Sequence, residues 1–148
     1  MGEVMIKKLN TITLAVWFSI VTISSAFADG HMAAIKKWSN GEFSLSALSA
    51  KEREKELKWF YDAAKPFAGM TLKVVSEGIP THVYESKTLT KAFEEITGIK
   101  VQHQIIGEGD VVMAVQTQMQ TNVSIYDAYV NDSDLIGTHA RMQQAVNL

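Results

Sequence analysis

Two clusters of polar side chains in this sequence could recognise a small ligand, and each directly follows a run of apolar residues. The first cluster consists of Ser76, Glu77, Thr81, His82 and Tyr84. Hydroxyl, carboxylate and imidazole groups beside an aromatic ring suit a hydroxylated ligand that has an apolar face. The Glu77 carboxylate can accept hydrogen bonds from two ligand hydroxyls. The alternative is a polar turn in which Glu77 is only hydrated.

The second cluster is Asn131-Asp132-Ser133-Asp134, which follows the apolar segment 125–130. Its amide and carboxylate groups can bind ligand hydroxyls. An aspartate at this place can instead cap the following helix by accepting a hydrogen bond from a backbone N–H. We assign the cap to Asp134. Asp127, inside the apolar segment, is a further candidate that needs a partner if it faces the core.

The residue spacing does not favour other chemistries. Cysteine is absent, which excludes disulfides, thiolate nucleophiles and cysteine zinc sites. The four histidines show no pair at metal-binding spacing. Gly107-Glu108-Gly109 resembles the start of a dinucleotide loop, but Val112 stands where that motif needs a third glycine. No serine has the context of a nucleophile elbow. We therefore expect no metal, no cofactor and no catalytic residue.

The composition is that of a globular protein. Of the 148 residues, 47 % are hydrophobic and 20 % are charged, which separates the chain from disordered sequences. This length suits one domain. The formal net charge of −2 provides no basic excess for binding a phosphate backbone, so a nucleic-acid partner is not expected.

The first 28 residues have the features of a secretory signal peptide. Lys7 and Lys8 precede an apolar core from Leu14 to Ile23, and Ala26 and Ala28 supply the small residues that signal peptidase requires. We expect cleavage after Ala28 and a periplasmic mature protein. The alternative is an uncleaved anchor, but the apolar core is shorter than the roughly 20 residues that span a bilayer.

The segment 29–69 is expected to form an N-terminal arm and an amphipathic helix. Residues 29–48 contain glycine, asparagine and several serines, which favour a surface arm. Ser49 and Glu52 match a capping box, which predicts a helix from there to about Ala64. The helical spacing of Leu57, Phe60, Tyr61 and Ala64 places these residues on one buried face.

Strands and helices alternate in the segment 70–148. Strands are expected at 72–75, 99–106 and 125–130, and helices at 83–97, 110–120 and 134–145. Gly98 is expected to cap the end of the first of these helices. Asp110 is expected to cap the start of the second, whose buried stripe is Val111, Val115 and Met119. This alternation predicts an α/β fold in which helices cover a parallel sheet. Ligands of such sheets bind at the carboxyl ends of the strands, which here are 76–82, 107–110 and 131–134.

Three stretches of this segment resemble the family 1 extracellular solute-binding proteins, which include the sugar- and polyol-binding components of ABC importers. They are 72–78, which reads as a first strand and a ligand loop, 91–101 with the sequence KAFEEITGIKV, and 125–134, a strand followed by a polar loop. The resemblance covers residues 70–148. It implies a periplasmic protein that presents a small sugar or polyol to importer permeases at the inner membrane, and it assigns Asn131 and Asp132 to the ligand.

The chain departs from this family in length, because family members have two lobes and several hundred residues. We therefore expect a truncated chain in which 1–28 is the signal peptide, 29–69 the arm and helix, and 70–148 part of the N-terminal lobe. The segment before the first strand is similar to a subgroup associated with glycerol-type polyol import. The alternatives are a small secreted α/β enzyme and a stand-alone interaction domain.

Overall fold

The computed structural model of the chain describes residues 29–130 and 136–143. The chain divides into two compact units, residues 1–61 and residues 62–148. In the described residues, no helix is long and apolar enough to cross a membrane.

The first unit is a helical hairpin. Residues 29–40 are helical, η1 (Glu42–Leu45) is a 3-10 turn, and α2 (Ala50–Ala64) runs back along the first helix. The His31 and Tyr61 rings stack at 5.0 Å, and Arg53 Nε donates to the Ser39 carbonyl over 3.0 Å, so the two helices are antiparallel. Ala34, Ile35 and Trp38 are buried.

The prediction of a surface arm over 29–48 is wrong, because residues 29–40 form a helix with an apolar stripe of its own. Gly41 ends this helix at a point where a Cβ atom would lie only 2.9 Å from the Lys37 carbonyl oxygen. The capping box of α2 is confirmed: the Ser49 N–H donates to Glu52 Oε2 over 2.8 Å, and the Glu52 N–H donates to Ser49 Oγ over 3.4 Å. The buried face of α2 is only partly as expected, since Phe60 is 43 % exposed.

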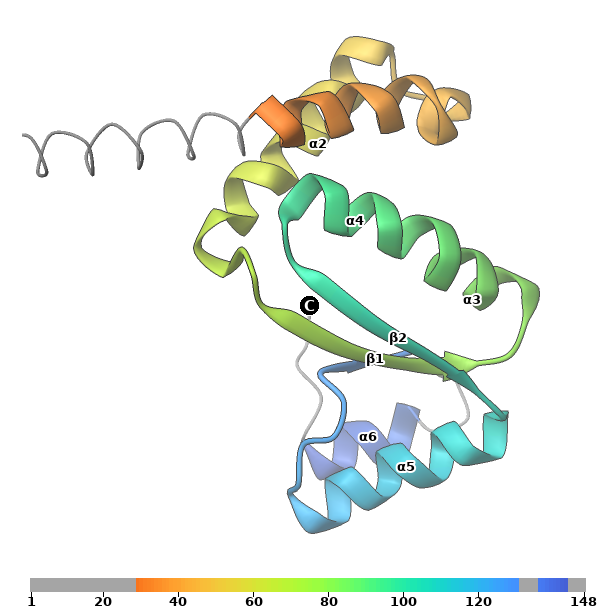
Figure 1. The fold of residues 1–148 in the computed structure, drawn as a ribbon. Coiled ribbons are helices and arrows are strands. Elements are labelled where there is room, and N and C mark those ends of the chain that lie inside the picture. Colours follow the sequence, from red (N-terminus) through yellow and green to blue (C-terminus); the bar gives the residue numbers. More distant parts are fainter. Residues whose placement is uncertain (1–28, 131–135, 144–148) are drawn as a thin grey trace, which may run out of the picture. The chain divides into compact units, whose positions relative to one another are not determined.

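The second unit is an α/β layer structure built on a small open parallel sheet (Figure 1). Its strands are β1 (Thr71–Glu77), β2 (Lys100–Ile106) and β3 (Ala128–Tyr129), in the order β2-β1-β3. Both pairings are parallel, with Thr71 opposite Lys100 and Val75 opposite Tyr129. The predicted parallel sheet with flanking helices is confirmed.

The connections between the strands cover the two faces of the sheet. The 3-10 turn η2 (Lys65–Phe67) precedes β1, and α3 (Pro80–Tyr84), the π-helical turn η3 (Glu85–Leu89) and α4 (Thr90–Thr97) join β1 to β2. α5 (Glu108–Thr121) joins β2 to β3, and α6 (Ile136–Met142) follows. Figure 1 shows α3 and α4 on one face of the sheet and α5 and α6 on the other.

One core lies between the sheet and α5. Val75 from β1 packs with the predicted stripe Val111, Val115 and Met119, all at most 5 % exposed. Ile106 and Tyr129 extend this cluster along the sheet. The alternation of β1 therefore sends Val75 to the α5 face, and it sends Val74 and Ser76 to the face that α3 and α4 cover.

Several boundaries differ from the expectations. β1 continues to Glu77 and α3 begins at Pro80, so the predicted loop 76–82 shrinks to two residues between a strand and a helix. α5 begins at Glu108 with Gly107 as its N-cap, so the expected cap at Asp110 is wrong; Asp110 lies in the first turn, where its charge complements the helix dipole. Gly98 is confirmed as a left-handed cap, with φ at 74°. β3 has only two residues, fewer than predicted.

Candidate functional site

The carboxyl edge of the sheet is where the topology favours a ligand. β1 is central, and the chain leaves it towards β2 on one side and returns to β3 on its other side. In a parallel sheet with this order, the connections diverge at the carboxyl ends of the central strands and leave a crevice between them. Here that edge contains Glu77 and the turn at Gly78, where the Ile79 N–H donates to the Glu77 carbonyl over 3.1 Å.

The predicted ligand residues of the first cluster occupy two different environments. Ser76 is fully buried, and His82 is 8 % exposed. Ser76 Oγ lies 2.7 Å from His103 Nε2, and His82 Nδ1 lies 3.1 Å from the Glu77 carbonyl oxygen. Protein partners therefore hold Ser76 Oγ and His82 Nδ1, and both residues offer little or no surface to a ligand.

The other members of the first cluster remain accessible. Glu77 is half-buried at the end of β1, Thr81 is exposed on α3, and Tyr84 is 43 % exposed at the end of that helix. Asn131 and Asp132, the predicted ligand residues of the second cluster, lie outside the described residues, as does the predicted cap Asp134. The accessible candidates among the described residues are thus Glu77, Thr81 and Tyr84.

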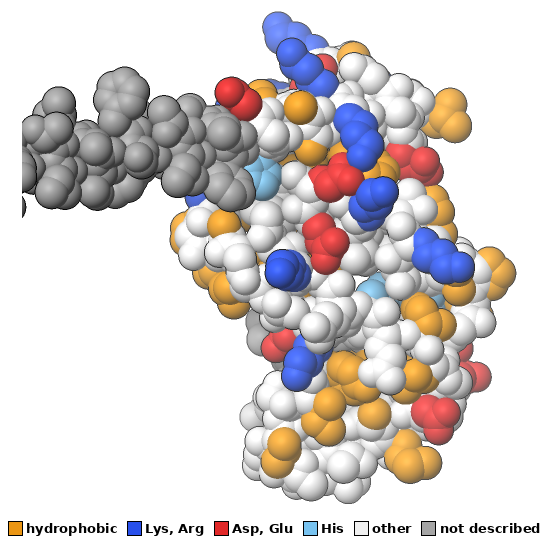
Figure 2. Space-filling view, viewed as in Figure 1, with side chains coloured by type: hydrophobic (Ala, Val, Ile, Leu, Met, Phe, Trp, Pro, Cys, Tyr) orange, Lys and Arg blue, Asp and Glu red, His pale blue; other side chains and the backbone are white. Residues whose placement is uncertain are grey.

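The edge is acidic. Glu108 and Asp110 are exposed in the first turn of α5, next to the end of β2, and Glu77 ends β1. Figure 2 shows acidic side chains at this end of α5. The segments 76–82 and 107–110 contain no lysine or arginine. Their electrostatic potential therefore disfavours anionic ligands.

His103 is the residue whose setting the sequence did not reveal. His103 lies on β2 opposite Val74, so its ring points to the face of the sheet that α3 and α4 cover, beside Ser76. Burial lowers its pKa; the nearby Glu85 carboxylate opposes this effect, and His82 adds to it. The contact could be predicted only if the register of the two parallel strands were known, and the sequence alone does not specify that register.

Asp127, the further candidate, has a structural role. Its backbone N–H donates to the Lys73 carbonyl and its Oδ2 accepts from the Lys73 N–H, both over 2.8 Å. Asp127 is exposed, so its charge stays hydrated while these bonds tie the entry of β3 to β1.

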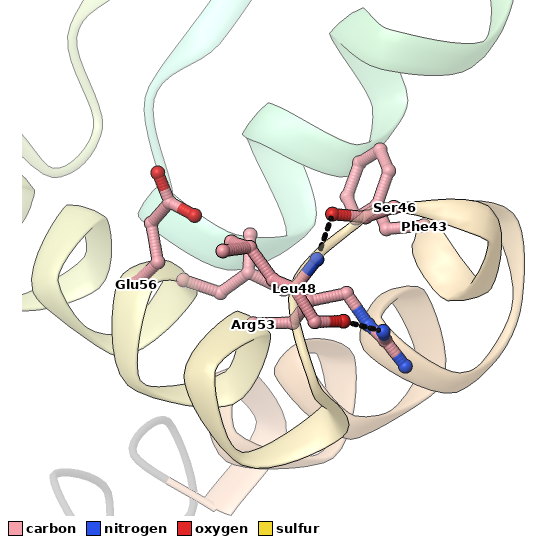
Figure 3. Close-up of a pocket in the computed structure, with 6 residues that line it drawn as sticks. Phe43, Ser46, Leu48, Arg53 and Glu56 are labelled. Carbon is pink, nitrogen blue, oxygen red and sulfur yellow. Dashed lines mark hydrogen bonds between the residues drawn. The ribbon is translucent and has the colours of Figure 1, made fainter.

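Two hollows lie away from the carboxyl edge. One, of about 400 Å³, lies beside the first half of β1 and is lined by Lys73, Gln102, His103, Gln104, Ile125 and Tyr126. The other, of about 240 Å³, belongs to the helical hairpin and is shown in Figure 3. There the Arg53 guanidinium already bonds to the Ser39 and Leu48 carbonyls, so its donors serve the hairpin itself.

In the part of the chain that the structure describes, no group of three His, Cys, Asp or Glu side chains could hold a metal ion. Comparison with family models, curated proteins and solved structures found no match for this chain. The function therefore has to be argued from the fold and from the residues at the carboxyl edge.

Proposed function

We propose that this chain is the substrate-binding component of an ABC importer, or part of one, and that it captures a small polyhydroxylated solute such as glycerol or a sugar in the periplasm. The observation that carries the proposal is the β2-β1-β3 parallel sheet, in which the accessible candidate Glu77 ends the central strand and Thr81 and Tyr84 follow it. This is the position at which open α/β sheets bind small molecules.

The chemistry of the edge suits a neutral hydroxylated solute. The Glu77 carboxylate accepts hydrogen bonds from ligand hydroxyls, and the exposed Tyr84 ring offers an apolar face. The acidic potential at this edge disfavours phosphorylated and carboxylated sugars. Asn131 and Asp132 would complete the polar side of the site, as the resemblance to solute-binding proteins implies.

In the proposed mechanism, this chain supplies one of the two lobes that enclose the solute, and the second lobe closes over it by a hinge motion. The closed form then docks on the permease subunits at the inner membrane. The chain binds and releases but catalyses no reaction, because the ATPase subunits of the importer supply the energy.

A secreted α/β enzyme is the competing function. The contact of 2.7 Å between Ser76 Oγ and His103 Nε2 has the length that a nucleophile and its base would need. Ser76 is fully buried, however, so a substrate does not reach its oxygen in this structure. This contact therefore does not favour the enzyme.

The proposal is tested by NMR titration of the ¹⁵N-labelled chain with glycerol, glucose, maltose and, as an anionic control, glucose 6-phosphate. Each compound is taken to concentrations at which the weak binding of a single lobe is detected. We expect dose-dependent shifts of the amides around Glu77, Thr81 and Tyr84 with a neutral compound and none with the phosphate. Asp132→Ala should weaken the response at least several-fold, whereas Glu56→Gln in the hairpin should leave it unchanged. Shifts that are absent for every neutral compound, or confined to other residues, would overturn the proposal.

A further inference from the structure

Two polar side chains, Ser76 from β1 and His103 from β2, meet on the face of the sheet that α3 and α4 cover. His82 from α3 and Glu85 from η3 lie near enough to act on the charge of His103. Ser76 and His103 are 2.7 Å apart across the two strands. The Ser86 hydroxyl, also from η3, donates to the His103 carbonyl over 3.4 Å. The main-chain carbonyl of His103 thus contacts η3, and its ring contacts β1, the central strand.

The protonation of His103 changes what this contact can do. A neutral imidazole has one donor and one acceptor nitrogen, so His103 Nε2 can accept the Ser76 hydroxyl proton. A charged imidazolium only donates, so Ser76 has to reverse its role and its own proton loses that acceptor. Because Ser76 is fully buried, the loss cannot be made good by bulk water unless the cover moves.

The helices above His103 are interrupted by a π-helical turn. The Thr90 N–H donates to the Glu85 carbonyl, a bond five residues long that makes η3 a single π-helical turn between α3 and α4. Such turns carry one residue more than an α-helical turn, are rare, and occur frequently at functional sites. The same run of helix begins at Pro80 and holds the end of β1 through His82, which binds the Glu77 carbonyl.

We propose that η3 and α3 form an acid-sensitive cover, which opens from the sheet when His103 is protonated. Glu85 from η3 and His82 from α3 are the ionisable groups that act on His103 from the elements packed against it. Opening would release the Glu77 carbonyl from His82 and so alter the carboxyl edge of the sheet. The device does not depend on which ligand that edge binds.

The direction of the pH effect follows from the partial burial of the imidazole. The folded chain holds the pKa of His103 below the ordinary value of about 6.5, because burial disfavours the charged ring. The closed cover is therefore fully stable above about pH 6.5 and loses stability as the pH falls from there towards the lowered pKa. One proton is taken up, so the opening equilibrium changes by at most about tenfold per pH unit.

The test is amide hydrogen exchange of the whole chain between pH 7.5 and pH 4.5, corrected for intrinsic exchange, with the His103 ring followed by NMR. We expect the amides of 83–89 to lose protection as the ring titrates, with a slope approaching tenfold per pH unit. His103→Gln should abolish this dependence, whereas His31→Gln in the hairpin should leave it intact. Unchanged protection of 83–89 after the His103 ring has titrated would overturn the proposal.

Two further variants keep the test decisive if His103→Gln fails to fold. Glu85→Gln removes the negative charge that favours the imidazolium in the closed cover, so the pKa of His103 should fall further and acid should open the cover more strongly than in the wild type. His82→Gln removes a neighbour that lowers this pKa, so acid should open the cover less strongly, relative to the same variant at pH 7.5. Acid effects that do not change in these opposite directions would show that His103 does not control the cover.

Discussion

At the scale of single residues, the side chain of Gln118 determines how the chain enters β3. Its Oε1 accepts hydrogen bonds from the Ile125 and Tyr126 N–H groups, both over 2.7 Å, and its Nε2 donates to the Tyr126 carbonyl over 3.0 Å. One side chain on α5 thus satisfies three backbone groups of the connection that follows it. With Asp127, it explains how a strand of only two residues keeps its register.

Replacing Gln118 by leucine should therefore destabilise the second unit. The change removes three hydrogen bonds and leaves the half-buried Tyr126 N–H without its partner, which costs about 1–3 kcal/mol. The loss is measured as a lower urea midpoint in chemical unfolding. Gln120→Leu, at an exposed position of the same helix, is the matched control and should change stability by less than about 0.5 kcal/mol. Equal midpoints for the two variants would contradict this role.

How far single residues could be predicted depended on the distance to their partners along the chain. The Ser49–Glu52 capping box and the left-handed Gly98 were predicted correctly, because each depends on neighbours within one helical turn. Ser76 and His82 were expected to face a ligand, yet Ser76 binds a ring 27 residues away and His82 binds the main chain of Glu77. The Ser76 contact follows from strand register, which local pattern does not specify. The His82 contact follows from the start of α3 at Pro80, where the sequence predicted a loop.

At the scale of elements, side chains from the covering helices close the free edge of β2. Within the residues that the structure describes, β2 pairs only with β1, so its outer backbone groups form an open edge of the sheet. Glu94 Oε1 accepts from the Val101 N–H over 2.7 Å, and the Ser86 hydroxyl donates to the His103 carbonyl over 3.4 Å. Occupied edge groups cannot pair with a strand of another molecule, which is a known protection against aggregation.

Removing this protection should promote self-association. Glu94→Ala frees the edge donor at Val101 and removes a charge from beside the strand, so we expect edge-to-edge dimers and larger species that increase with concentration. Sedimentation velocity measures them directly. Glu95→Ala, which makes the same change in net charge on the adjacent position of α4, should remain like the wild type. A monomeric Glu94→Ala variant would show that the carboxylate does not guard the edge.

The elements were predictable where their apolar pattern was strong. The stripe Val111, Val115 and Met119 identified α5 and its buried face, and the alternation in 99–106 identified β2. The helix over 29–40 was missed because Gly30 and the later serines resemble an arm, although Ile35 and Trp38 lie one helical turn apart. The third strand was predicted too long, because only Ala128 and Tyr129 find a partner on β1.

At the scale of the whole molecule, the two units differ in what they bring to a function. The hairpin buries an apolar stripe and exposes Trp59 at 63 %, and it contains none of the predicted ligand residues. All of those predicted residues belong to the second unit, which has the parallel sheet and the acidic edge. A solute-binding role therefore requires the residues of the second unit and a periplasmic location of the chain.

That compartment can be tested through processing of the N-terminus. Ala26 and Ala28 supply the small residues that signal peptidase requires, so expression in a bacterial cell should give a periplasmic protein that begins at Asp29. N-terminal sequencing and intact mass measure this start. Ala28→Leu should block cleavage and leave the longer chain, because a large side chain replaces one of the two small residues that signal peptidase requires. Ala33→Leu, at an exposed position beyond the cleavage site, should be processed normally. A full-length wild-type chain in the cytoplasm would remove the basis for a periplasmic solute-binding role. The proposal of an acid-sensitive cover would be unaffected, because it depends only on contacts within the second unit.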